Sequence, residues 1–376
     1  MPLTGHYERR RFLRDLAAIV AISSLPAMGA APRGRLRFMA LGQAAIQYDL
    51  REHPYPGFAA LAALTRQADI SFTDLETPIA GPGAEKATRD TIFLKAAEPA
   101  VLDCLKDLSV NVLALSNNHA WDFGAGGVLA TRDAVRSRGF CYAGTGENLT
   151  QATAPGYRDT PAGRIALVSM ASGAIRDGAA ATATRAGVNE LRLEADGELN
   201  AQDAARNLAA IREAARNARY VFCYQHNHYW EKDFRVTPEW QRKWARQCID
   251  AGACAFVSHG APLLHGIELY LGRPIFYDLG SLVFHTKTPA GYYPAEVWDS
   301  AIADCVFDDG RLISLELIPV VLNESGVSRE LFYETRGVPR IARGDDASRI
   351  LNRLQQLSSA AGVSMAQVGD VARVAV

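Results

Sequence analysis

Five of the eight histidines in the sequence fall in three short polar segments, and each segment directly follows an apolar run. The first segment ends in His119, the second contains His226 and His228, and the third contains His259 with His265 close behind. A single histidine usually serves packing, but five at corresponding positions are poorly explained by packing alone. We therefore predict that the three segments meet in one shared polar site.

Acidic and amide side chains accompany these histidines. Asp74 and Glu76 follow an earlier apolar run, Asn118 directly precedes the first histidine of the cluster, and Asp122 and Glu231 each come three residues after a histidine. Imidazole, carboxylate and amide oxygen together suit Zn, Mn or Fe. A carboxylate beside an imidazole also equips the pair for acid–base catalysis. Two hypotheses therefore stay open, one divalent transition metal or a metal-free acid–base site.

Short apolar strands alternate with amphipathic helical stretches, and the polar segments come at the strand ends. Strands are expected over 37–41, 69–73, 110–115, 165–170, 220–224 and 255–258, and helices over 57–67, 126–138, 200–217 and 238–251. Such alternation favours a mostly parallel sheet covered by helices. Ligands of such folds bind beyond the carboxyl ends of the strands. The polar segments are therefore expected to lie where ligands bind.

The pattern changes in the last third of the sequence. Two antiparallel hairpins are expected there, over 267–278 and 301–321, each around a turn that contains glycine. Residues 171–195, rich in Ala, Gly and Thr, are interpreted as a long surface loop, and the tail after Asp345 as helical. Because no repeat or low-complexity linker interrupts the chain, we predict one domain of the α/β class.

The N-terminal residues have the pattern of a targeting signal. Residues 9–13 fit the twin-arginine pattern, an apolar stretch follows over 16–25, and small residues over 27–31 offer a cleavage site. A spanning helix needs about twenty apolar residues, and neither this stretch nor any later segment is long enough. We predict that residues 1–31 are a twin-arginine-type signal and that the protein is exported to the periplasm or the cell exterior.

The overall composition excludes some partners. The 40 basic and 41 acidic side chains nearly cancel, so the chain lacks the basic surplus of nucleic-acid-binding proteins. The six cysteines are scattered without a Cys-x-x-Cys spacing, which does not support a zinc ribbon or a thioredoxin motif. We expect buried thiols, no nucleic-acid partner and no stable transmembrane span in the mature chain.

Three blocks of the sequence resemble a known family. They are the residues 74–79, 116–124 and 258–284, and their order and spacing agree together. Over residues 35–325 the chain resembles the CapA family of capsule and poly-γ-glutamate synthesis proteins, whose fold is similar to that of the calcineurin-like metallophosphatases. The resemblance implies a layered sandwich of mixed β-sheets flanked by helices. Residues 326–376 are expected to follow it as a C-terminal helical extension.

The metallophosphatase layout implies metal-binding roles for the residues that match it. Glu76 is expected as a carboxylate shared between metals, and Asn118 as a ligand through its amide oxygen. His226, or His228 two residues on, is expected as a further ligand, and His259 completes the set. The expected metal ligands are Asp74, Glu76, Asn118, His226 and His259.

Acid–base residues complete the predicted site. His119 with Asp122, and His228 with Glu231, are expected as two catalytic pairs. The resemblance implies that the first of these histidines is the general acid that protonates a leaving group. A bidentate arginine is also expected to hold a substrate carboxylate. The expected substrate-binding residues are Arg192, Trp230 and His265.

Two positions depart from the family pattern. Gln43 ends the first strand where the family has aspartate, and a glutamine cannot supply an anionic oxygen. Pro262 stands where the family has the second histidine of a Gly-His-x-Pro-His-like loop. Both missing groups would serve the same metal, so we predict that a dinuclear centre cannot form. Either one metal or none is expected, and phosphate displacement clamped by two metals is disfavoured.

Three functional hypotheses follow. The leading one is an exported CapA-like protein of capsule or poly-γ-glutamate biosynthesis, which acts on a γ-glutamyl or peptide-like polymer together with envelope biosynthesis partners. Its site would be mononuclear or metal-free. The second is a metal-independent acid–base enzyme on the same fold, a peptide epimerase or hydrolase. The third is a non-catalytic protein that binds an anionic polymer.

Overall fold

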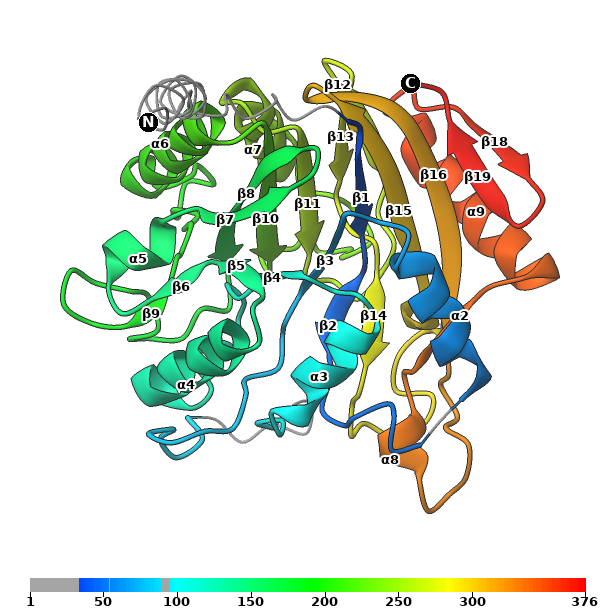
Figure 1. Cartoon of the computed structure of the whole chain (residues 1–376), viewed down its shortest axis with the longest axis horizontal. Coiled ribbons are helices and arrows are strands. Elements are labelled where there is room, and N and C mark those ends of the chain that lie inside the picture. Colours follow the sequence, from blue (N-terminus) through cyan, green and yellow to red (C-terminus); the bar gives the residue numbers. More distant parts are fainter. Residues whose placement is uncertain (1–33, 54, 89–94) are drawn as a thin grey trace, which may run out of the picture. The chain divides into compact units, whose positions relative to one another are not determined.

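A nine-stranded mixed sheet forms one layer of the fold (Figure 1). The computed structural model describes residues 34–53, 55–88 and 95–376, and the predicted signal segment 1–31 lies outside them. Strands β1, β3, β4 and β5 run parallel, and β15 and β16 form the long hairpin that the sequence predicts. The strand order is β18 (Met365–Val368), β19 (Val371–Val374), β16 (Arg311–Leu322), β15 (Asp299–Asp308), β1 (Leu36–Ala40), β3 (Ile70–Asp74), β4 (Val112–Ala114) and β5 (Cys141–Ala143), with β17 (Pro339–Ile341) also paired to β16.

A second sheet has six strands. Its order is β12 (Ile267–Tyr270), β13 (Arg273–Phe276), β11 (Ala255–His259), β10 (Tyr220–Asn227), β8 (Gly163–Ser172) and β7 (Gly156–Thr160). The four inner strands are parallel, and β7 and β12 add antiparallel edges. The predicted β12–β13 hairpin turns through Leu271 and Gly272, whose φ angles are 52° and 70°. Glycine suits the second position because it has no Cβ to clash in this conformation.

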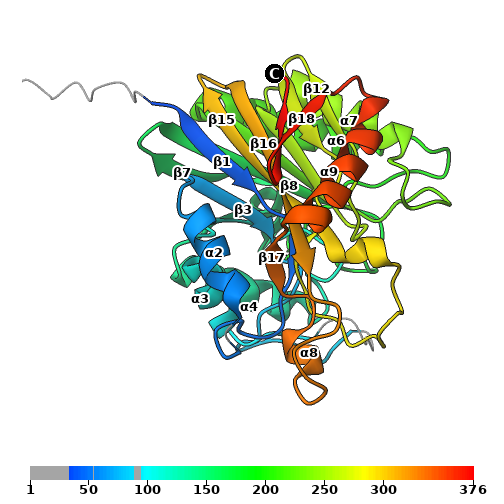
Figure 2. The ribbon, with the colours of Figure 1, turned by 90° about the vertical axis from the view of Figure 1, so that its right-hand side faces the viewer.

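The two sheets pack face to face and bury a common apolar core (Figure 2). Phe38 of β1 stacks on Phe222 of β10 with ring centroids 3.9 Å apart. Phe307 of β15 meets Phe222 edge to face at 5.8 Å. All three rings are buried. Contacts between these rings join β1 of the first sheet to β10 of the second, and β10 carries His226 of the predicted polar segments.

Helices cover the outer faces of both sheets. Helices α2 (Pro56–Thr65), α3 (Ala100–Asp107) and α4 (Gly124–Ser137) pack outside the nine-stranded sheet, and α6 (Ala201–Asn217) and α7 (Glu239–Asp250) outside the six-stranded one. Trp244 of α7 is fully buried in the core outside the second sheet. The predicted layered α/β sandwich of mixed sheets flanked by helices is confirmed. The smaller elements are β2 (Gln43–Ala45), β14 (Ser281–Phe284), β6 (Thr145–Gly146), β9 (Gly187–Val188), α5 (Leu149–Thr153), α8 (Phe332–Thr335) and the 3-10 helix η2 (Ala295–Trp298).

The segment 171–195 differs from the surface loop that we expected. Val188, Asn189 and Leu191 are buried, and β9 pairs with β6. The side-chain amide of Asn189 donates to the carbonyl of Ser169 and to Oδ1 of Asn207, each at 2.8 Å. The small residues of the segment 171–195 allow this close packing. Composition alone does not distinguish such a buried segment from an exposed loop.

The C-terminal extension is only partly helical. Helix α9 (Gly344–Ser359) matches the expectation, but β18 and β19 form a hairpin and β19 joins the nine-stranded sheet beside β16. Helix α9 buries Ile350, Leu351 and Leu354 in the core that the two sheets share. Residues Gly34–Val376 form one compact unit, so the extension is part of the same domain.

Among the described residues, no helix combines the length and the apolar character that crossing a membrane requires.

Candidate active site and metal centre

The predicted polar segments converge where the carboxyl ends of both sheets' parallel strands meet. Strand β3 ends at Asp74, and β4 leads into the buried segment Ser116–His119. In the second sheet, β10 carries His226 and β11 ends at His259, and these two residues are register partners on adjacent parallel strands. The site is therefore assembled from two sheets, which explains why its residues are far apart in the sequence.

Three side chains form a cluster that can hold a metal ion. Glu76, His226 and His228 each offer a ligand atom, and these atoms lie within 4.8 Å of one another. The Nε2 atom of His226 is 3.0 Å from Nε2 of His228 and 3.9 Å from Oε1 of Glu76. Asn118 extends the cluster, because its Oδ1 atom is 2.9 Å from the same Nε2 of His226.

The spacing of these atoms fits a single cation. Atoms bound at about 2.1 Å from one metal ion lie about 3.0–3.4 Å apart in octahedral or tetrahedral geometry. The distances around Nε2 of His226, from 2.9 to 3.9 Å, bracket this range. Carboxylate, imidazole and amide oxygen are also ligand types that a divalent transition metal accepts. The residues present therefore fit one metal ion.

The opposite side of the His226 ring faces an acid. Its Nδ1 atom lies 3.4 Å from Oδ2 of Asp74 and 3.2 Å from the Tyr224 hydroxyl. Burial opposes the charged form of His226, but the hydrogen bond and charge of Asp74, together with the charge of Glu76, outweigh it and raise the pKa of His226. A carboxylate behind a ligating histidine fixes the ring and leaves the other nitrogen for the metal. Asp74 lies outside the three-residue cluster and is placed for this orienting role.

His259 lies beside this cluster but is not one of its three members. Its side chain is 1% exposed, and neither ring nitrogen has a hydrogen-bond partner among the described residues. Burial, with a smaller effect of His226, lowers the pKa of His259 to about 3. A buried neutral imidazole with two unpaired nitrogens is costly unless a ligand satisfies it. This orphaned ring is a second observation that fits a cation at the site.

His119 and Asp122 form the predicted pair. The Nδ1 atom of His119 lies 2.7 Å from Oδ2 of Asp122, and its Nε2 atom lies 3.9 Å from Oε1 of Glu76. The backbone N–H of His119 also donates to Oδ1 of Asn117 at 3.1 Å. Asn117 in turn donates to Oδ1 of Asp74 at 3.2 Å. Hydrogen bonds therefore join His119 through Asn117 to Asp74, which lies behind the candidate ligand His226.

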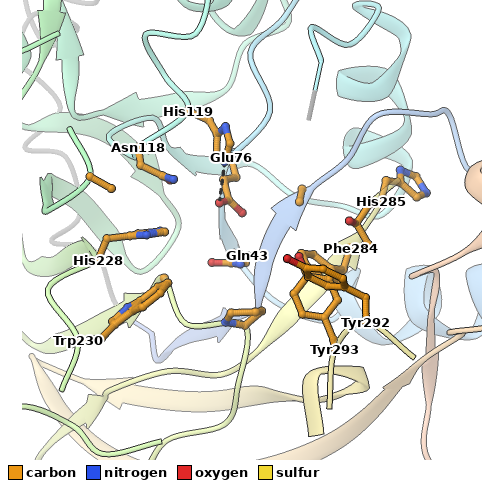
Figure 3. Close-up of a pocket in the computed structure, with 15 residues that line it drawn as sticks. Gln43, Glu76, Asn118, His119, His228, Trp230, Phe284, His285, Tyr292 and Tyr293 are labelled. Carbon is orange, nitrogen blue, oxygen red and sulfur yellow. Dashed lines mark ion pairs between the residues drawn. The ribbon is translucent and has the colours of Figure 1, made fainter. Parts of the chain in front are cut away.

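These side chains open into a pocket of about 390 Å³ (Figure 3). Glu76, Asn118, His119 and His228 line one part of it, and His228 packs against Trp230 with ring centroids 4.7 Å apart. The rest of the wall is largely aromatic. Its aromatic residues include Phe284, Tyr292 and Tyr293.

Gln43 and Pro262, the two departures from the family pattern, line this same pocket. The Gln43 side chain is buried, and its Oε1 atom has no hydrogen-bond partner among the described residues. Pro262 has no side-chain donor or acceptor atom at all. The donor set for a second metal does not fit here, because a neutral amide and a proline replace an anion and an imidazole.

Residues 38–286 match the model of a family described as the bacterial capsule synthesis protein PGA_cap. The chain belongs to this family. It is 28% identical to an uncharacterized protein of Sinorhizobium fredii, over 86% of this chain and 89% of that protein. It is 30% identical to the PGA biosynthesis protein CapA of Bacillus subtilis, over 60% and 56%. It is 27% identical to a probable polyglutamine synthesis accessory protein of Mycobacterium tuberculosis, over 85% and 80%. The family recognised from the sequence motifs is confirmed.

Within this family fold, three predicted residues belong neither to the pocket wall nor to the contacts around His119 and His226. Arg192 is paired with Asp203, Nε to Oδ2 at 2.7 Å and Nη2 to Oδ1 at 3.2 Å, so its fork already holds a carboxylate of the protein itself. Glu231 is exposed and is not among the residues that line the pocket. His265 is buried, with Nε2 at 3.0 Å from the carbonyl oxygen of Phe234, and it therefore anchors the loop that follows Trp230.

The sequence indicated Trp230 but not the other aromatic residues of the pocket wall. Tyr292 and Tyr293 lie in a segment that follows β14, and no spacing rule connects them to the histidines. Arg336 anchors this segment, because its buried guanidinium donates to the carbonyl oxygens of Thr288 and Pro289. The adjacent pair Tyr292-Tyr293 was the available signal, but buried tyrosines are also a normal part of protein cores.

Proposed function

We propose that this protein is an exported enzyme of capsule or envelope polymer metabolism that uses one divalent metal ion. Its substrate would be an amide bond of a γ-glutamyl or peptide-like polymer. The observation that carries the proposal is the cluster of Glu76, His226 and His228 at the pocket, with Asn118 in contact and the His119–Asp122 pair beside it. The names of the relatives, PGA biosynthesis protein CapA and capsule biosynthesis protein CapA, support the polymer class.

The cation would be held by Glu76, Asn118, His226 and His228, with His259 as the adjacent unpaired imidazole. Zn, Mn and Fe suit this mixture of nitrogen and oxygen donors. A bound divalent ion supplies Lewis acidity toward a carbonyl oxygen of the substrate. The protein's own part is to fix these donors, and the contact between Asp74 and His226 fixes the most deeply buried one.

His119 is proposed as the general acid. Asp122 accepts a hydrogen bond from Nδ1 of His119, which leaves Nε2 as the atom that exchanges a proton with the substrate. In amide hydrolysis the oxygen of a water molecule bonds to the carbonyl carbon, the C–N bond breaks, and the nitrogen leaves as an amine that must gain a proton. His119 lines the pocket where it can donate that proton. After the transfer, the carboxylate of Asp122 stabilises the ring in the orientation needed for the next cycle.

The polymer specificity is supported by the pocket wall. No lysine or arginine is among the described residues that line it, whereas Trp230, Phe284, Tyr292 and Tyr293 do. A chain with regularly spaced carboxylates would therefore place its uncharged backbone in the pocket and keep most carboxylates outside. Trp230 and Tyr292, which are 44% and 55% exposed, are suited to contact the chain at the entrance.

The test uses the full chain, expressed with its own N-terminal segment and purified without chelators. Metal content is measured by mass spectrometry, and turnover of a γ-glutamyl oligomer by the appearance of new amino groups. About one metal equivalent is expected, lost in Asn118→Ala and retained in the matched exposed variant Asn217→Ala. His119→Ala should keep the metal and lose turnover.

Two other outcomes contradict the proposal in different ways. Protein without metal whose turnover still depends on His119 would be the metal-independent acid–base enzyme. Protein without metal or turnover that still binds the oligomer would be the non-catalytic polymer-binding protein. Export is tested separately, since replacing Arg9 and Arg10 by lysine should retain the protein in the cytoplasm if the twin-arginine prediction is correct.

A further inference from the structure

The pocket contains a buried polar group that the proposed metal chemistry does not use. Gln43 is 2% exposed, it lines the pocket, and its Oε1 atom has no hydrogen-bond partner among the described residues. A buried acceptor that is left unpaired destabilises the folded protein. Such an atom at a pocket wall is satisfied best by a donor on a bound ligand.

The backbone around Gln43 is held firmly. Its N–H donates to the carbonyl oxygen of Gly280 at 3.0 Å, and Thr73 donates its hydroxyl to the carbonyl oxygen of Gly42 at 2.6 Å. Gly42, the residue before β2, also approaches β14 very closely, because a Cβ added to it would lie 2.5 Å from the carbonyl carbon of Ser281. A side chain larger than glycine there would force the strands apart, so the position of Gln43 depends on this contact.

The direction of the side chain places it between the two halves of the pocket. Figure 3 shows Gln43 below Glu76, with His228 and Trp230 on one side and Phe284, Tyr292 and Tyr293 on the other. The last torsion of a glutamine side chain is broad, so the carboxamide can turn its oxygen toward a ligand. Gln43 therefore lines the same pocket as Glu76.

The charge of the site explains why a neutral group suits this position. Glu76 lines the same pocket as Gln43, and Asp74 and Asp278 are further buried carboxyl groups. A further aspartate at position 43, without a second metal, would add an uncompensated buried charge. With glutamine and Pro262 the same space is neutral, and it can accept an uncharged polar group of a ligand.

We infer that Gln43 recognises a backbone amide of the substrate, in the space where the family pattern would place ligands of a second metal. Its Oε1 atom accepts a hydrogen bond from the N–H of the amide chain. The inference rests on the proposed function for the class of polymer. It goes beyond it by assigning amide recognition to a residue outside the metal and acid–base sets.

The test compares two probes that differ in one atom per linkage. One is a synthetic γ-glutamyl tetramer, and the other is its ester-linked counterpart, which keeps the carboxylates but has oxygen in place of each N–H. Binding is measured by calorimetry in the His119→Ala background so that turnover does not consume the probes. We expect the amide probe to bind about tenfold more tightly than the ester.

The Gln43→Met variant isolates the contribution of the carboxamide. An unbranched side chain of similar length should reduce the preference for the amide probe to within about twofold, since the acceptor is gone. The carbonyl oxygen of an ester is also a weaker acceptor than that of an amide. Only the part of the amide preference that is lost in Gln43→Met is therefore assigned to Gln43. Gln67→Leu, an exposed glutamine beside Arg37, serves as the control and should retain the tenfold preference.

Gln43→Glu keeps the inference testable if the methionine variant does not fold. It retains an acceptor and adds a charge, so it should bind both probes more weakly and still prefer the amide. Equal binding of the two probes to the parent protein, or an unchanged preference in Gln43→Met, would overturn the inference.

The proposed function can fail independently of this result. A preference for the amide that depends on Gln43, without metal or turnover, leaves the recognition subsite in place and removes the enzyme. Metal and turnover without any preference for the amide would support the proposed enzyme and remove the recognition subsite. If neither probe binds, the inference is wrong, and the metal content still decides whether the metal centre exists.

Discussion

His119 and Asp122 are joined through Nδ1 and Oδ2 at a distance of 2.7 Å, and both side chains are buried. This contact fixes which nitrogen of His119 faces the pocket. Asp122→Asn keeps the size of the side chain but replaces the carboxylate by an amide that can present a donor to the ring. We expect turnover of a γ-glutamyl oligomer to fall by about a hundredfold or more, within the range known for acid–base groups. Metal content should stay near one equivalent. Loss of the metal would contradict the proposal that the His119–Asp122 pair and the metal ligands have separate roles.

Gln43 and Pro262 line one pocket, and we predict that together they prevent a second metal from binding. Restoring both donors, in the double variant Gln43→Asp with Pro262→His, should raise the bound metal from about one to about two equivalents. Each single variant supplies only one of the two missing donors, so neither should exceed one equivalent. Metal analysis of the four proteins after equilibrium dialysis checks this prediction. Two equivalents in the parent protein would show that Gln43 and Pro262 do not prevent a second metal from binding.

His265 should make the folded state sensitive to acid. Burial lowers the pKa of its imidazole to about 4, whereas the unfolded chain takes up a proton near pH 6.5. Its stabilising effect is therefore complete above pH 6.5 and is lost as the pH falls toward 4. At pH 5 the loss of unfolding free energy due to this group is about 2 kcal/mol. Urea unfolding at pH 7 and pH 5 should show a smaller loss of stability for His265→Gln than for the parent.

An equal loss in both proteins would contradict this assignment. His259 and His285 also have lowered pKa values, to about 3, because both are buried. They contribute to the acid sensitivity of both proteins alike, so the difference between parent and variant isolates His265.

Arg336 should hold the aromatic wall in place. Its guanidinium lies 4.7 Å from the Trp298 ring and 5.0 Å from the Phe332 ring, and it donates to the carbonyl oxygens of Thr288 and Pro289. Arg336→Met would leave these buried carbonyl groups without their donor, and we expect a loss of about 2–4 kcal/mol of unfolding free energy. Arg340→Met, which removes an exposed pair with Asp346, should change stability by less than about 1 kcal/mol.

The same variant should also weaken oligomer binding, because Tyr292 and Tyr293 belong to the segment that Arg336 anchors. Calorimetry with the γ-glutamyl tetramer measures this effect. Unchanged affinity in a folded Arg336→Met protein would mean that the wall keeps its position without the arginine.

Most of the fold was accessible from the sequence because strands and helices leave periodic apolar patterns. Strands β3, β4 and β11 end within one residue of the predicted ends, and the β12–β13 and β15–β16 hairpins form around the expected turns. The segment 171–195 was misjudged because small residues pack in interiors and in loops alike. The short pair β18 and β19 was missed because a hairpin of a few residues is stabilised mainly by the sheet it joins.

The sequence by itself determined the residue types of the site, the family, and the absence of the two donors at positions 43 and 262. These follow from local motifs, which carry their information in order and spacing. Only the tertiary structure decided that His228 joins Glu76 and His226, that Asp74 lies behind the ring of His226, and that Arg192 binds Asp203 away from the pocket. The reason is physical: residues from two separate sheets meet at one pocket, and their distances depend on how the sheets pack.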